Sequence, residues 1–195
     1  LSADRDIAVL VPGTFRRSGR LLQIIEGLPA PQRGLCLDTA LTSVDVGDVP
    51  VHRALLDRIG PELRATLSAH QVHEMVRAVD GYRRSRRRER CLASLASAGV
   101  RATVCGHVDA DMPELSSHDV LPACDEGALV SLLRRSRVVV DPGAGFVQGG
   151  HERGLSAMAA GAAVVCERNT FWSEAFADGR EFVGFEWGAL SDLGT

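Results

Sequence analysis

The chain has 195 residues, of which 45% are hydrophobic and 24% are charged, and its formal net charge is −3. This balance excludes fibres, coiled coils and disordered tails, and it predicts a globular domain with a substantial core. Apolar runs such as residues 7–11 are far shorter than the roughly 18 residues of a membrane-spanning helix, so we expect no membrane span. The mild acidic excess argues against nucleic acid as a partner.

The basic and cysteine residues set an expectation about cellular context. All 22 basic residues are arginine, which indicates a GC-rich, most simply bacterial, genome. The five cysteines form no Cys-x-x-Cys pair and are odd in number, so they do not describe a disulfide framework, and we expect a cytoplasmic protein. Because the chain starts at Leu1 without a leader, we expect a piece of a longer protein.

The first half of the chain predicts one strand followed by helices. Residues 7–11 are an apolar run closed by a Pro-Gly pair, which is typical of a buried strand, and residues 21–25 have helical spacing. Turn-forming residues then dominate, with one short strand expected at residues 35–37. Helical spacing returns at residues 51–69, around a Gly-Pro break that predicts two short helices, and continues from residue 75.

The second half alternates regularly between strands and helices. Strands are expected at residues 101–105, 120–121, 138–141, 163–166 and 182–185, with helices at residues 125–135, 151–160 and 171–176. This alternation predicts an α/β fold with a doubly wound, Rossmann-like parallel sheet. We expect one domain over residues 1–195, with a helical insertion around residues 50–80.

Three loops follow strands at the edge where such sheets bind ligands, namely residues 13–19, 106–111 and 142–150. The third loop is glycine-rich and leads directly into a helix. Free backbone N–H groups and the positive end of the helix dipole would therefore face the same space, which favours an anion site.

The order of residues 138–142, 149–153, 157–165 and 178–181 resembles the carboxyl-terminal domain of group 1, GT-B type glycosyltransferases. The similarity is greatest to the spore-maturation CgeB-like branch. In that family a helix of the form Arg-x-x-Glu-Ala-Met-Ala-x-Gly follows the donor-binding loop, and an Asp-Gly-x-Glu turn precedes the last strand. The matching residues here are Arg153, Ala157, Met158, Ala159, Gly161, Asp178 and Gly179.

The resemblance implies a metal-independent glycosyltransferase whose donor is a nucleotide-diphosphate sugar, with no cofactor. An N-terminal partner domain of the same protein would complete the active site, so the chain alone is expected to transfer no sugar and its catalytic residues are left unassigned. The residues expected to bind the nucleotide sugar are Gly13, Arg16, Arg17, Gly106, Gln148, Gly149, Gly150, His151, Glu152, Arg153 and Ser156.

Two positions depart from the family pattern and support a second hypothesis. Gln148 and Ser156 stand where related enzymes carry a Glu-x7-Glu pair. The alternative is a noncatalytic nucleotide-binding or assembly module that kept the fold, and a third hypothesis is another nucleotide-binding α/β domain, such as a sugar-nucleotide epimerase. Glu152, one turn before Ser156, either replaces a sugar-contacting carboxylate or caps the helix, and we favour the cap.

Other charged and cysteine residues have structural explanations that compete with functional ones. Asp109 and Asp111 have the Asp-x-Asp form of a metal site on a diphosphate, but an acidic loop after a strand is more often solvated. Residues 83–90 contain six arginines that point all round a helix. This favours a solvated helix start first, a domain-contact or anionic partner patch second, and nucleic-acid binding third. Cys105 and Cys166 are predicted to be small core residues.

Overall fold

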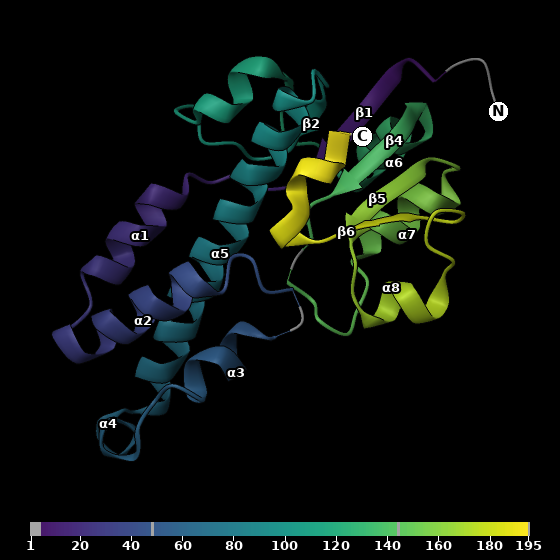
Figure 1. Ribbon diagram of the computed structural model, residues 1–195. Helices are drawn as coiled ribbons and strands as arrows, with labels where there is room; N and C mark the ends of the chain where they lie inside the picture. Colours follow the sequence, from purple (N-terminus) through teal and green to yellow (C-terminus); the bar gives the residue numbers. More distant parts are fainter. Residues whose placement is uncertain (1–4, 48, 144, 195) are drawn as a thin grey trace.

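The computed structural model describes residues 5–47, 49–143 and 145–194, and six parallel strands form its sheet (Figure 1). The strands are β1 (Ile7–Pro12), β2 (Thr103–Cys105), β3 (Asp119–Leu121), β4 (Ser136–Asp141), β5 (Ala163–Glu167) and β6 (Val183–Phe185). Their order is β3-β2-β1-β4-β5-β6, with every neighbouring pair parallel. The predicted α/β fold, Rossmann-like in general kind, is therefore confirmed.

Eight α-helices and two 3-10 helices connect and cover the strands in the described part of the chain. The helices are α1 (Ser18–Glu26), α2 (Ala30–Thr42), α3 (Val51–Leu56), α4 (Pro61–Thr66), α5 (Ala69–Ser97), α6 (Glu126–Arg135), α7 (Glu152–Ala159), α8 (Thr170–Ala175), η1 (Pro113–Ser117) and η2 (Trp187–Gly194). Within the described ranges, none of these helices combines the length and apolar character needed to cross a membrane.

β1 lies at the centre of the sheet, where the direction of winding reverses. Leu10 of β1 pairs with Thr103 of β2 on one side and with Val139 of β4 on the other. The chain reaches β2 through α5 on one face of the sheet and returns from β3 to β4 through α6 on the other. The carboxyl ends of β1 and β4 therefore lie side by side at the reversal, where ligands bind in sheets of this kind.

Both faces of the sheet are covered by apolar side chains. On one face, Leu92 of α5 packs with Phe185 and Trp187, and all three side chains are buried. On the other face, Ala157 of α7 and Trp172 of α8 pack with strand residues of β4 and β5. Burial on both faces explains why the strands read as continuous apolar runs and not as alternating ones.

The helices α1 to α4 and the first half of α5 pack on one another beside the sheet, and we call this group the helical lobe (Figure 1). Its own apolar cluster contains Ile25 of α1, Cys36 of α2, Leu55 of α3 and Met75 of α5, all fully buried. The short strand expected at residues 35–37 is wrong, because this segment lies in α2. Cys36, Thr39 and Ala40 recur at helical spacing and are the residues that α2 buries.

The arginine-rich segment of α5 is not solvated as expected. Arg83, Arg87 and Arg88 are at most 9% exposed. The Arg87 side chain donates from Nε to the Val44 carbonyl at 2.9 Å and forms an ion pair with Glu167 of β5 at 3.2 Å. The arginines of α5 therefore join the helical lobe to the sheet, because the carbonyl groups of a loop and a buried carboxylate compensate their burial.

Candidate functional site

A cleft of about 770 Å³ lies between the carboxyl edge of the sheet and the helical lobe. One wall is formed by the residues that follow β1, β2 and β3 and by the first residues of α7, and the opposite wall is formed by α1 and α5. This is the edge at which the order of the strands reverses. Its position and size are those of a small-molecule site in a doubly wound sheet.

The floor of the cleft is built by the close approach of the loops after β1 and β2. The Gly13 N–H donates to the Cys105 carbonyl at 2.9 Å, and the Phe15 N–H donates to the His107 carbonyl at 2.7 Å. Gly106 has a φ of +142°, and a Cβ at this position would lie 1.8 Å from the Gly13 oxygen. Only glycine allows the two loops to meet in this way.

Arg153, in the first turn of α7, reaches across to the end of β1. Its Nη1 donates to the Pro12 carbonyl at 2.6 Å, and its Nη2 lies 2.8 Å from Nε2 of His151. His151 caps α7, since its side chain accepts from the Arg153 N–H, so the expected capping role of Glu152 is wrong. Burial and the Arg153 charge lower the pKa of His151, which keeps the imidazole neutral beside the guanidinium.

Arg88 supplies a second guanidinium from the opposite wall. Its Nη1 donates to the Thr14 carbonyl at 2.7 Å, so α5 holds the loop after β1 from the other side. Burial and the nearby charges of Arg153 and Arg84 lower the pKa of Arg88 to about 10. The group still carries its positive charge at neutral pH, although three cations repel one another there.

A buried carboxyl group lies behind this cluster at the end of β4. Asp141 is 3% exposed, and its Oδ1 has no hydrogen-bond partner among the described residues. Burial raises its pKa, while the charges of Arg153, His151 and Arg88 act in the opposite direction. Asp141 does not line the cleft and lies instead at a small separate hollow, which His151 and Glu167 also line.

The structure brings together about half of the residues predicted to bind a ligand. Those that line the cleft are Gly13, Arg16, Gly106, His151, Glu152 and Arg153. Gln148 lines a separate shallow hollow beside α8, and Gly149 accepts a hydrogen bond from Asn169 through its carbonyl. A Cβ on Gly150 would lie 2.4 Å from the Phe171 ring, so this glycine serves packing, and Ser156 is exposed on α7.

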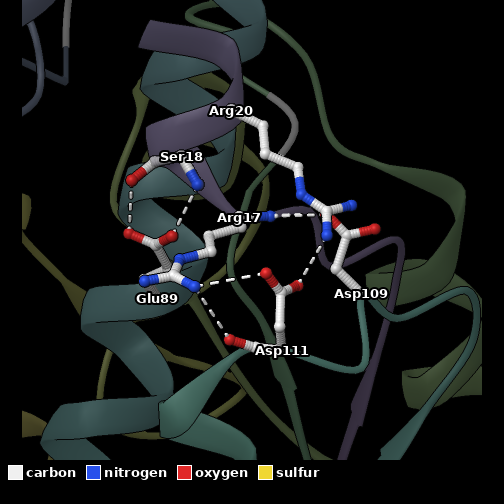
Figure 2. Close-up of polar contacts among 6 residues, drawn as sticks. All are labelled: Arg17, Ser18, Arg20, Glu89, Asp109 and Asp111. Atoms are coloured by element: carbon white, nitrogen blue, oxygen red, sulfur yellow. Dashed lines mark hydrogen bonds and ion pairs between the residues drawn. The ribbon is translucent and has the colours of Figure 1, made fainter. Parts of the chain in front are cut away.

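Arg17 does not line the cleft. It takes part in a surface ion-pair cluster, which Figure 2 shows. Its backbone N–H donates to Asp109 at 2.9 Å, and its guanidinium lies 3.2 Å from Asp111. Arg20 contacts the same two carboxylates, at 3.5 and 3.0 Å. Arginines therefore satisfy the Asp-x-Asp pair, and no group of metal-ligating side chains occurs within the described residues.

The start of α1 is also bound to α5 beneath this cluster. Glu89 is 4% exposed and accepts from both the backbone N–H and the hydroxyl of Ser18, each at 2.6 Å (Figure 2). The first turn of α1 contains no acidic residue of its own. The Glu89 carboxylate therefore supplies the negative charge that stabilises the N-terminus of this helix. The wall that α1 contributes to the cleft is thus fixed from two sides.

Sequence reasoning missed the arginines that α5 contributes to the cleft, which are Arg77, Arg84 and Arg88. For Arg84 and Arg88 the signal was present, because residues 83–90 contain six arginines. Their positions all round the helix axis suggested solvation, whereas α5 in fact passes between the sheet and the other helices and is covered on several sides.

No protein-family model matches the chain, and no curated protein matches it. Among solved structures, the chain is similar to a crystal structure described as a predicted phosphoglycolate phosphatase from Haemophilus somnus 129PT. The sequence identity is 10% and the TM-score is 0.38, with the whole of both chains covered. At these values the likeness transfers no activity to this chain.

These comparisons contradict the predicted membership in the GT-B glycosyltransferases and its CgeB-like branch, and with it the predicted sugar transfer. No model of that family matches the chain, and no curated protein of that kind does either. The physical reason lies in the motif. A glycine-rich loop, a helix of small residues and a following strand allow close packing at the edge of a parallel sheet, and this packing serves many reactions.

Proposed function

We propose that this chain binds a small organic phosphate in the cleft between the sheet and the helical lobe. The observation that carries the proposal is the charge of the lining. Five arginines face two glutamates there: the arginines are Arg16, Arg77, Arg84, Arg88 and Arg153, and the glutamates are Glu74 and Glu152. Guanidinium groups bind phosphate oxygens through paired hydrogen bonds, so such a lining favours a phosphate.

The positions of the arginines support a preformed anion site. Arg153 is held by the Pro12 carbonyl at the end of β1 and Arg88 by the Thr14 carbonyl in the loop that follows, from opposite walls of the cleft. Burial is the main cause of the lowered pKa of Arg88, and the positive charge of Arg153 lowers it further, because the two guanidinium groups repel each other. A phosphate between them would relieve this repulsion, and the two side chains would lose little conformational entropy on binding.

The size and the apolar part of the cleft support an organic ligand and not free phosphate alone. A volume of about 770 Å³ exceeds the space that a single phosphate fills. Leu21 and Ile24 of α1 and Leu129 of α6 also line the cleft. We place the phosphate at the loop after β1 and the organic part of the ligand towards these apolar side chains.

Calorimetric titration tests the proposal with orthophosphate, pyrophosphate and a panel of organic mono- and diphosphates. We expect at least one organic phosphate to bind more tightly than orthophosphate, with an affinity that falls as salt increases, since the contacts are ionic. A variant of the cleft lining provides a second measurement. Arg84→Gln should weaken the affinity about tenfold or more, because a charged hydrogen bond worth about 1.5–3 kcal/mol is removed. The matched control is Arg53→Gln, at an exposed position of α3 away from the cleft. Absence of binding by the whole panel at millimolar concentrations would refute the proposal.

A further inference from the structure

Two cysteines meet at the wall of the cleft. The Sγ atoms of Cys105 and Cys124 lie 3.5 Å apart, although 18 residues separate the two positions in the chain. Cys105 is the last residue of β2 and is 4% exposed, whereas Cys124 lies in the connection from β3 to α6 and is exposed. The other three cysteines of the chain are buried.

The two positions differ in a way that suits a stepwise oxidation. The carbonyl of Cys105 accepts the Gly13 N–H, and its strand pairs with both neighbours, so the backbone of Cys105 is fixed. Cys124 follows β3 by three residues and directly precedes the α6 cap Asp125, outside the sheet. A disulfide needs an S–S separation of about 2.05 Å, so the two sulfurs must approach by about 1.5 Å, and strand pairing does not hold Cys124 in place as it holds Cys105.

We propose that Cys105 and Cys124 are a reversible thiol–disulfide site that a hydroperoxide oxidises. Cys124 is the attacking thiol, because this residue is exposed whereas Cys105 is buried. Cys105 is the resolving thiol, since it lies beneath Cys124 within van der Waals contact of its sulfur. Burial, together with the neighbouring Cys124, raises the pKa of the Cys105 thiol to about 11, which disfavours Cys105 as the first nucleophile.

The step balances with one hydroperoxide per chain. The Cys124 thiolate attacks the hydroperoxide, an S–O bond forms, the O–O bond breaks, and the leaving alkoxide takes the thiol proton as an alcohol. The Cys105 sulfur then attacks the Cys124 sulfenic acid, the S–S bond forms, and hydroxide leaves with the Cys105 proton as water. Two thiols lose two electrons, and the hydroperoxide gains them. A small dithiol reverses the reaction by thiol–disulfide exchange.

The experiment treats the full chain with hydrogen peroxide and counts thiols by alkylation and intact mass. We expect the five thiols to fall to three and to return to five with dithiothreitol. No arginine or lysine lies between the two cysteines, so trypsin leaves both in one peptide, residues 102–134, which should lose two hydrogens. Cleavage after Glu114 should then give two fragments that only a reductant separates.

Variants separate this site from general thiol oxidation. In Cys105→Ser, the Cys124 sulfenic acid has no resolving thiol and should be trapped by dimedone. Cys124→Ser should keep its four thiols under the same treatment, and the control Cys36→Ala, altered in the helical lobe, should still form the disulfide. A Cys124–Cys124 linkage between two chains, overoxidation of Cys124 with Cys105 still reduced, or no loss of thiols in the unaltered chain would each overturn the proposal.

Discussion

The ion pair between Arg87 of α5 and Glu167 of β5 makes a sharp stability prediction, because it joins the helical lobe to the sheet. The two side chains are 2% and 5% exposed, and their charged atoms lie 3.2 Å apart. Arg87 also donates from Nη2 to the Val46 carbonyl at 2.6 Å and lies 4.7 Å from the centre of the Trp187 ring. Removal of one partner would leave the other charge buried.

Arg87→Met removes the cation and keeps much of the apolar stem. Loss of one member of a buried pair costs about 3–5 kcal/mol, which for a chain of this length corresponds to a fall in Tm of roughly 6–20 °C. Glu167→Gln should cost less, about 1–3 kcal/mol, because the amide oxygen still accepts from Arg87. The double variant should cost less than the sum of the two single variants, since neither buried charge remains.

The cost of Arg87→Met should also depend on pH. Burial raises the pKa of Glu167, and Arg87 opposes this rise, so the carboxyl of the variant has a still higher pKa in the folded state. The Glu167 carboxyl therefore loses its proton at a lower pH in the unfolded chain than in the folded chain. Between these two pKa values the free energy of unfolding falls as pH rises. The variant should therefore lose more stability at pH 8 than at pH 5.

Urea denaturation followed by circular dichroism measures these differences. Arg77→Met is the matched control, because it lies on the same helix in an exposed pair with Glu74 and should change the free energy of unfolding by less than about 0.5 kcal/mol. The reasoning would be refuted if the destabilisation of the double variant equalled the sum of the two single destabilisations within about 0.5 kcal/mol. The two charges would then not interact.

Three further predictions concern the loops and termini of elements. Gly106→Ala should destabilise the fold by about 2–5 kcal/mol in urea denaturation, because the new Cβ meets the Gly13 oxygen and φ stays positive. Asp125→Ala should lower Tm through the loss of about 1 kcal/mol, since Asp125 caps α6. The backbone N–H of Gly184 lowers the pKa of Asp178, so this carboxylate stabilises the fold above its unfolded pKa, and the contribution is lost as pH falls through its folded pKa. Asp178→Asn should therefore flatten the loss of stability below about pH 4 in an acid titration followed by fluorescence.

The strand-and-helix alternation was readable from the sequence because each element carries its own periodicity. In an apolar run such as residues 138–140, successive side chains point to opposite faces of a strand, so all of them are buried only when both faces of the sheet are covered. Such runs therefore indicate buried parallel strands. The glycines after β1 and β2 marked the loops that meet at Gly13 and Gly106. Gly13, Gly106 and Arg153 were accordingly placed at the correct edge of the sheet from sequence alone.

The tertiary structure alone decided which charges face the cleft and which are buried elsewhere. Arg17 and Arg16 are neighbours in the sequence, yet Arg17 pairs with Asp111 at the surface and Arg16 lines the cleft. Arg87 and Arg88 are also neighbours, and they contact different sides of the molecule, Glu167 and the Thr14 carbonyl. The role of a charged side chain depends on partners that are distant in the sequence, and the local periodicity of the sequence does not indicate which partners these are.

The function of the chain was likewise beyond the sequence, for a physical reason. Small residues after a glycine-rich loop report that a helix packs closely on a strand, a requirement of the fold that many activities share. The contact between Cys105 and Cys124 was equally invisible, because it depends on β2 and β3 being neighbours in the sheet. Local sequence determined the elements and the edge of the sheet where the cleft lies, and the packing of α5 against the sheet determined the charge of the cleft lining.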